Sequence, residues 1–351
     1  MIKIRALGFF QVRQVLDLLK AHHGEHLHTK ILEKLHHCYV PFQRISQLLP
    51  PRFQFMPIIY VAVSRNKVFG FIWLRTDGVK GSRLRIEQVL IDPTKFSYDI
   101  GTQLVNFVVN RYGAEGVQTF LALVHENADE AQALFKTCGF RHVTKVLSYV
   151  HTSPSDIGDG EAQDIHGLRE SGRQDRLKLK ELYTDCLAPE TRICLEKAVD
   201  DFNGPLAKTY RTNTLAPGSQ PVFFKRWVIE DVVHDVLLAA VDVVTDNCRD
   251  FHINLLVSPG WSDGLESLLD YGVSQVLKNT ESAQIHVACY LFNKELNHLL
   301  EEKGFSRTET AEVLVKDYWI PLQDDSQTQQ SPILAFPGKT SPACLKPTAQ
   351  S

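Results

Sequence analysis

Residues 87–93 read EQVLIDP, and residues 94–101 read TKFSYDIG. The first run is typical of a buried β-strand, and it stops at Pro93, which cannot donate a backbone hydrogen bond to a neighbouring strand. The second run is a short polar loop that leads into an amphipathic helix. Further along, residues 131–140 read AQALFKTCGF, which indicates a helix ended by Gly139 and followed by an aromatic residue of the next strand. This succession predicts a phosphate-binding loop, because backbone N–H groups and the helix dipole favour an anion at a helix N-terminus.

The segments around this stretch alternate in the same way. Residues 58–74 hold two β-rich runs around a polar turn and predict a hairpin. Residues 152–164 are rich in Ser, Pro, Gly and Asp and predict a linker. Before that linker, strands are expected at 3–6, 58–63, 68–74, 87–91, 117–124 and 142–150, and helices at 9–21, 30–49, 100–112 and 128–137.

A second copy of this order follows the linker. Gly139 comes 46 residues after Pro93, and Gly304 comes 45 residues after Pro259. Together with matching hairpins and helix pairs, this spacing favours an internal duplication over two unrelated domains. The second copy is expected to have strands at 165–169, 226–230, 236–245, 250–257, 283–289 and 312–320, and helices at 175–187, 190–201, 263–277 and 293–303.

The bulk composition is that of an ordinary globular protein. The 351 residues are 44% hydrophobic and 23% charged, with a formal net charge of −3. This charge gives no general field for nucleic acid or an anionic membrane, and the most apolar stretch, 232–244, is broken by charges, so no membrane span is expected. Seven cysteines without CxxC spacing are typical of reduced thiols, and a cytoplasmic location is expected.

The order of strand, proline, loop, helix and a later Gly-Phe pair closely resembles the core of the GNAT superfamily of acyl-CoA-dependent N-acyltransferases. The resemblance covers the first 150 residues and recurs, more weakly, between Phe251 and Phe305. It implies an α/β (α+β) fold of two tandem GNAT-type domains, each with a mixed, mostly antiparallel central sheet flanked by helices. The implied domains are residues 1–151 and 165–322, followed by a disordered tail at 323–351.

The resemblance also implies a site for acetyl-CoA as co-substrate. The family's pyrophosphate loop falls on residues 96–101, where only Gly101 matches the family's glycine pattern. Asp99 is either a helix cap or an unfavourable charge beside the phosphates, and Gly101 is either a cradle for the phosphates or a packing glycine. The strand residues Val89 and Ile91 fall at positions where the backbone pairs with pantetheine, at a strand that splays from its neighbour, often at a β-bulge. The cofactor-binding residues predicted in this way are Val89, Ile91, Lys95, Ser97, Tyr98, Asp99, Ile100, Gly101, Thr102, Asn127 and Phe135.

Acyl transfer to an amine requires a base for the ammonium proton. In the family such bases lie on this strand, at positions that hold Arg85 and Glu87 here. Because side chains alternate along a strand, Glu87 is expected on the same face as Val89 and Ile91, pointing into the cleft. The alternative is a strand carboxylate paired with a nearby arginine.

The family's general acid is a tyrosine, and its position holds Phe135 here. Phenylalanine cannot donate a proton, so the thiolate leaves unassisted or through water, another hydroxyl substitutes, or the domain is not catalytic. In the second copy the tyrosine position holds Leu300, and the positions of Arg85 and Glu87 are assigned to Phe251 and Ile253. The second domain is therefore expected to be degenerate and structural.

Six histidines and Cys38 crowd residues 22–38. Because the family's first two helices line the acceptor pocket, a role in shaping the substrate site is favoured over a metal site. The leading hypothesis is an N-acetyltransferase that moves acetyl from acetyl-CoA to a primary amine of a small molecule or peptide, by direct attack in a ternary complex, in the N-terminal domain. The alternative is a non-catalytic acyl-CoA-binding or scaffold protein. The sequence does not indicate an oligomeric state.

Overall fold

The computed structural model describes residues 2–23, 58–77, 82–92, 98–153, 165–204, 222–280 and 283–318. The expected helix at 30–49 and the tail beyond residue 318 lie outside these ranges. In the chain from residue 2 to residue 151, which we call the first half, the elements follow the expected order. They are β1 (Lys3–Ala6), α1 (Phe9–His23), β2 (Ile58–Ser64), β3 (Lys67–Asp77), β4 (Arg83–Ile91), α3 (Tyr98–Ala114), β5 (Thr119–His125), α4 (Asp129–Thr137) and β6 (Arg141–His151).

The second half, residues 165–318, repeats this order. The predicted helix at 190–201 is wrong in its extent: α6 ends at Leu195, Glu196 is extended, and a separate 3-10 turn follows. No described helix combines the length and apolar character that a membrane crossing requires. The elements are β7 (Leu168–Glu170), η4 (Arg173–Asp175), α5 (Arg176–Asp185), α6 (Pro189–Leu195), η5 (Val199–Asn203), β8 (Phe223–Asp231), β9 (Val236–Thr245), β10 (Asp250–Val257), η7 (Ser262–Gly264), α7 (Leu265–Leu277), β11 (Gln284–Tyr290), α8 (Lys294–Glu302) and β12 (Ser306–Asp317).

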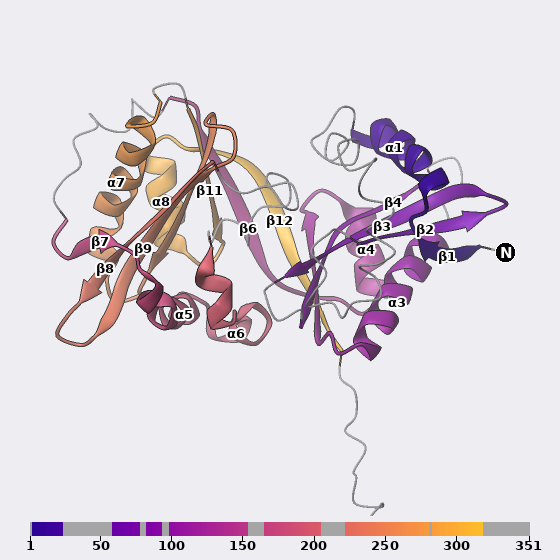
Figure 1. Cartoon of the computed structure of the whole chain (residues 1–351), viewed down its shortest axis with the longest axis horizontal. Coiled ribbons are helices and arrows are strands. Elements are labelled where there is room, and N and C mark those ends of the chain that lie inside the picture. The colour runs from indigo at the N-terminus through magenta and orange to yellow at the C-terminus, as the bar shows by residue number, and fades with distance from the viewer. Residues whose placement is uncertain are drawn as a thin grey trace, which may run out of the picture. The chain divides into compact units, whose positions relative to one another are not determined.

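The described strands of both halves form one twelve-stranded sheet, in the order β1-β2-β3-β4-β5-β12-β6-β11-β10-β9-β8-β7. The expected two sheets are therefore joined at their centre, where β6 and β12 pair antiparallel (Figure 1). β12, the last strand of the second half, also pairs with β5, and β6, the last strand of the first half, also pairs with β11. Each half thus completes its sheet with a strand from the other.

The strand registers support the duplication. In the first half a β-bulge at Phe69 interrupts the β2–β3 ladder, and in the second half a bulge at Leu238 interrupts the β8–β9 ladder. Each bulge carbonyl accepts a backbone hydrogen bond of 2.8 Å from the end of the next strand, from Asp92 in one half and Ser258 in the other. Two independent irregularities at equivalent places are more than a shared fold class requires.

The helices divide between the two faces of the sheet. In the first half, α3 and α4 lie on one side of the strands and α1 on the other (Figure 1). The α3 and α4 face packs around Leu104, Phe120 and Phe135, while the α1 face packs around Leu19 and Trp73. In the second half, α7 and α8 cover one face, and α5 and α6 cover the other. The core under α5 and α6 also includes Leu121, Val146 and Val313 from the central strands β5, β6 and β12.

Candidate functional site

The candidate site lies where β4 and β5 diverge. These parallel strands pair only from Arg83 and Thr119 to Ile86 and Ala122. Beyond Ile86, β4 continues to pair with β3 on its other side, while β5 pairs with β12. The far end of β4 therefore has one edge that faces no neighbouring strand in the described ladders, as the resemblance predicted.

A β-bulge marks the point of divergence. Trp73 pairs with Gln88 and Leu74 pairs with Ile86, so Glu87 is the extra residue of β4. An extra residue shifts the alternation of side chains by one position. The resemblance predicted a bulge at this strand. The simple alternation rule that placed Glu87 did not take the inserted residue into account.

The prediction that Glu87 shares a face with Val89 and Ile91 is wrong. Val89 and Ile91 pack on the α3 and α4 side of the sheet. Glu87 lies on the opposite side, where its carboxylate Oε1 is 3.0 Å from Nε of Arg75. Arg75 pairs across the ladder with Arg85, which places all three charged residues on the α1 side.

The backbone of β4 is oriented as the cofactor prediction requires. Asp92 donates its N–H to Phe69 of β3. Because successive peptide groups of a strand point to opposite edges, the backbone groups of Val89 and Ile91 point to the other edge, where β5 has diverged. These N–H and C=O groups are available for an added extended chain such as an amide-bearing arm.

Burial and charge act against each other on Glu87. Its side chain is 2% exposed. Burial raises the pKa of Glu87, the cations Arg75 and Arg85 oppose that rise, and Asp77 adds to it, so that the pKa lies above its ordinary value. A carboxylate with a raised pKa beside an opening in the sheet is a stronger base than an ordinary glutamate and is suited to accept a proton.

The start of α3 supplies five of the predicted residues, Tyr98 to Thr102. Ile100 is buried in the core, and the Thr102 hydroxyl bonds to the Cys138 thiol, so both point inward. Asp99 is exposed, and its carboxylate accepts a hydrogen bond of 2.8 Å from the Gln103 side chain one turn on. The Asp99 carboxylate therefore lies along the outer surface of the helix.

Gly101 faces the core. A β-carbon at this position would lie 3.0 Å from the Ile91 δ-carbon and 3.1 Å from both methyl groups of Leu134. The glycine therefore allows close packing of α3 on β4 and α4, which favours the packing alternative for its role.

We expect Gly101→Leu to lower the free energy of unfolding by about 1–3 kcal/mol through overpacking and to abolish acetyl-CoA binding, because it displaces Ile91. Gly101→Ala is the matched control: its better helix propensity offsets the tight contact to within about 1 kcal/mol. Denaturant unfolding and titration calorimetry measure the two effects. Unchanged binding in Gly101→Leu would remove α3 from the proposed cofactor site.

Of the predicted residues outside α3 and β4, the structure describes Phe135 and Asn127. Phe135 lies in the core, with its ring 5.0 Å from that of Phe140 in an edge-to-face contact. Asn127 is exposed in the turn before α4. Lys95, Ser97 and the side chain of Tyr98 lie outside the described residues, so their contacts with cofactor stay predictions.

The histidine-rich stretch is also mostly outside the described ranges. His22 and His23 belong to the end of α1, and the rest of the stretch follows it. Among the described side chains, no three His, Cys, Asp or Glu gather as ligands for a metal ion.

The second half has no counterpart of the ion pair between Arg75 and Glu87. The parallel ladder from Asp250 to Ile253 of β10 corresponds to the ladder from Arg83 to Ile86 of β4. The assignment of Phe251 and Ile253 to the positions of Arg85 and Glu87 is therefore wrong by one residue, because β4 contains the inserted Glu87. β10 has no register shift against β9.

These registers identify the true counterparts. Arg85 corresponds to His252, Arg75 corresponds to Val244, and Glu87 has no counterpart. The set of Arg75, Arg85 and Glu87 is thus absent from the second half, where the same face of the sheet holds a different buried ion pair, Arg226–Asp242. This difference agrees with the expectation that the second half is degenerate.

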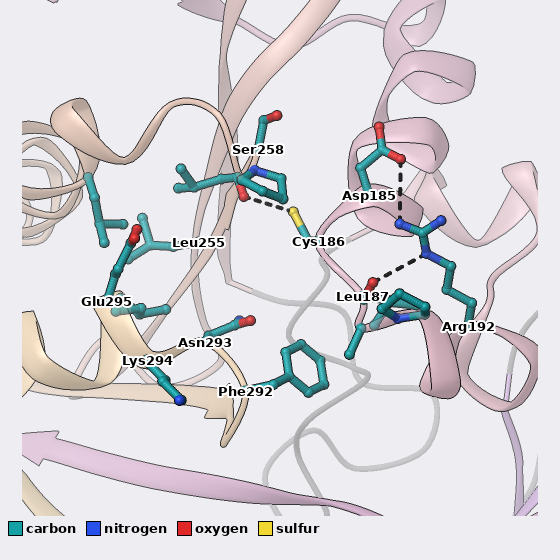
Figure 2. A pocket seen from close by; sticks show the side chains of 16 residues that line it. Asp185, Cys186, Leu187, Arg192, Leu255, Ser258, Phe292, Asn293, Lys294 and Glu295 are labelled. Carbon is teal, nitrogen blue, oxygen red and sulfur yellow. Dashed lines mark hydrogen bonds and ion pairs between the residues drawn. The ribbon is translucent and has the colours of Figure 1, made fainter.

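The second half nevertheless contains a cavity that the sequence did not indicate. It has a volume of about 530 Å³ and lies at the end of β10, at the start of α8 and under the connection between α5 and α6 (Figure 2). This is the place equivalent to the opening beside β4. Its lining includes Leu187, Leu255, Val257, Phe292 and Asn293.

Two side chains of the second half occupy the places from which a cofactor would contact the backbone of β10 and α7. The Cys186 thiol donates to the carbonyl of Val257 at 3.1 Å, as Figure 2 shows; burial raises the pKa of this thiol to about 12. The indole of Trp261 packs against Gly264, where even a β-carbon would lie 2.1 Å from the ring. The Val257 carbonyl and the approach to the N-terminus of α7 are therefore both obstructed by the chain itself.

Comparison with known proteins agrees with this geometry. The sequence model of the Acetyltransferase (GNAT) family matches residues 21–140, which include β4, α3, β5 and α4. No curated protein matches the chain. The family's sequence pattern is thus found in the first half.

Solved structures extend the likeness to both halves. A tandem GNAT protein from the clavulanic acid biosynthesis pathway is 15% identical with a TM-score of 0.56, over 91% of this chain and 99% of that one. A GCN5-related N-acetyltransferase from Sphaerobacter thermophilus is 10% identical with a TM-score of 0.56, over 91% and 96%. A putative acetyltransferase from Pyrococcus horikoshii is 11% identical with a TM-score of 0.51, over 91% and 90%. At these identities the likeness establishes the fold, which is that of a tandem GNAT protein.

Proposed function

We propose that this protein is an acyl-CoA-dependent N-acetyltransferase whose active site lies in the first half. The observation that carries the proposal is the divergence of β4 from β5 at the Glu87 bulge. It combines a free strand edge, a helix that follows the strand, and a buried carboxylate at one place. The second half lacks the bulge and the carboxylate, which supports assigning turnover to the first.

In the proposed reaction the pyrophosphate of acetyl-CoA binds at the N-terminus of α3, and pantetheine pairs with the backbone of Val89 and Ile91. Glu87 accepts the proton of the substrate ammonium, directly or through water. The amine lone pair then attacks the thioester carbonyl carbon, the new C–N bond forms, and the C–S bond breaks. CoA leaves as a thiolate, and the remaining proton that the nitrogen loses to become an amide passes through water to this thiolate, since Phe135 has no proton to give.

The acceptor is a primary amine, carried by a small molecule or by a peptide. Release of free thiol from acetyl-CoA, measured against a panel of metabolite amines and peptides, tests the function. Absence of thiol release with every amine would contradict catalysis.

A second candidate function is acyl-CoA binding without turnover. Phe135 favours it, because the position of the family's general acid is an apolar side chain packed in the core. The two functions differ in one measurement. A binding protein takes up acetyl-CoA but releases no thiol, whereas the transferase does both.

We expect one acetyl-CoA to bind per chain. In the second half, Cys186 and Trp261 obstruct the backbone groups that would take pantetheine and pyrophosphate. Titration calorimetry gives the stoichiometry, and Asn293→Trp, which fills the second cavity, is the control. We expect this variant to keep the stoichiometry and affinity of the natural protein. Two equivalents per chain, reduced to one by Asn293→Trp, would show that the second cavity is also a cofactor site.

A further inference from the structure

A buried charge cluster beside Glu87 is shared between the two halves. A small cavity of about 20 Å³, roughly the size of one water molecule, is lined by Asp77, Arg83 and Arg85 from the first half. Tyr183, Leu195 and Lys197 line it from the second half. Arg85 and Asp77 are also the groups whose charges act on Glu87. The environment of the candidate base therefore extends into the second half.

The second half reaches this cluster through the segment between α6 and η5. Arg83 donates one guanidinium N–H to the backbone carbonyl of Glu196, and its other Nη lies 3.9 Å from the carboxylate of Asp201. Asp201 is in turn fixed, because its carboxylate accepts the backbone N–H of Ala198 at 2.9 Å. Contacts at both ends thus hold residues 196–201 against the edge of the first-half strands.

Lys197 is the cation that this segment delivers. The residue is 6% exposed, and its ammonium lies 4.6 Å from the ring centre of Tyr183 and 5.8 Å from that of Phe202. The faces of aromatic rings attract a cation. Burial lowers the pKa of Lys197 to about 7, with the charge of Asp77 as the largest opposing influence. Below neutral pH the ammonium is therefore charged.

Asp77 is the anion that Lys197 faces. Burial alone would raise the pKa of Asp77, but the nearby cations Arg83, Arg85, Lys197 and Arg75 outweigh burial, so the pKa lies below its ordinary value. Arg85 consequently serves two carboxylates, Asp77 and Glu87. When a second cation also balances the charge of Asp77, Asp77 competes less with Glu87 for the guanidinium of Arg85.

We propose that Lys197, contributed by the second half, is a positioning residue for Glu87: it neutralises Asp77 across the shared cavity and leaves the Arg85 guanidinium to the Glu87 carboxylate. This inference rests on the proposed role of Glu87 as base. It gives the second half a part in the chemistry of the first, although β10 has no counterpart of Glu87. The charged groups involved are Arg75 and Asp77 of β3, Arg83, Arg85 and Glu87 of β4, and Lys197 and Asp201 of the second half; α1 covers this face with apolar side chains.

The test follows the titration of Glu87 itself, so that it does not require turnover. The full-length protein is labelled with ¹³C at glutamate carboxyl groups, and Glu87→Gln assigns the Glu87 signal. We expect Lys197→Met to raise the titration midpoint of Glu87 by about one pH unit, since a nearby cation favours the carboxylate. We expect Lys197→Arg, which keeps the charge, to restore most of the shift.

The matched control is Lys180→Met. Lys180 is also a second-half lysine with a carboxylate partner, Glu196 at 3.0 Å, but it does not line the shared cavity. We expect no shift of the Glu87 midpoint in this variant. Thermal unfolding verifies that each variant is folded.

The outcomes separate this inference from the proposed function. A Glu87 midpoint that is the same in Lys197→Met and the natural protein, or that shifts equally in Lys180→Met, overturns the role of Lys197. If the midpoint shifts as expected and the natural protein releases thiol, the acidic limb of the rate profile should move by the same amount in Lys197→Met. A shifted midpoint without turnover in the natural protein keeps the electrostatic link and contradicts only the transferase.

Discussion

Glu87→Gln is expected to lower the rate of acetyl transfer by about 10²–10⁴-fold, the usual contribution of a positioned base. Glutamine has nearly the same shape but cannot accept the ammonium proton. The affinity for acetyl-CoA should be unchanged, because the proposed cofactor contacts on β4 are made by the backbone of other residues. Steady-state rates and calorimetry on the same preparations measure both quantities.

The pH dependence adds a second criterion. Because the pKa of Glu87 is raised above its ordinary value, the rate of the natural protein should rise with pH through a limb above the usual glutamate range. That limb should be absent in Glu87→Gln. The control is Glu126→Gln, which removes an exposed carboxylate paired with Lys145 and should leave rate and profile intact. Equal rates in the natural protein and Glu87→Gln would make Glu87 a structural partner of Arg75.

Removal of β12 is expected to unfold both halves. A chain that ends at residue 304 loses the strand that pairs with β5 of the first half and with β6. It also loses Val313, Leu314 and Val315, which are buried in the cores of both faces. The loss should exceed the whole free energy of unfolding of an ordinary domain, about 5–15 kcal/mol, so no cooperative unfolding transition should remain.

The matched control ends at residue 318. It removes the residues after Tyr318 and keeps β12. We expect it to unfold at the same temperature as the full chain. A chain ending at residue 304 that kept a cooperative transition for the first half, by circular dichroism and calorimetry, would show that the exchanged strand is dispensable.

Local patterns predicted most of the elements, because hydrophobic periodicity and proline or glycine stops are encoded within each segment. The divergence of β4 and the choice of Glu87 as the candidate base came from the resemblance to the GNAT superfamily. The face of Glu87 was predicted wrongly because one inserted residue reverses the alternation. The same insertion explains why counting back from Pro259 gave Phe251 and Ile253, one residue away from the true counterparts.

Features that depend on distant segments were not predictable in this way. The pattern of β12 indicates a strand but not that its partner is β5. The obstruction of the second-half site by Cys186 and Trp261 depends on packing between elements. Lys197 stands alone between two helical turns, and only the tertiary fold brings it to the charges around Glu87.

The exchange of β6 and β12 has a consequence for synthesis of the chain on the ribosome. Thr119 of β5 meets Asp317 of β12 across a sequence separation of 198 residues. At about 5–20 residues per second, the ribosome needs roughly 10–40 s to add that length. During this interval β5 has a free edge of hydrogen-bonding groups, which is a site for mispairing with other nascent chains. The speed of elongation and the supply of chaperones should therefore influence the yield of native protein more than they would for a chain whose halves close independently.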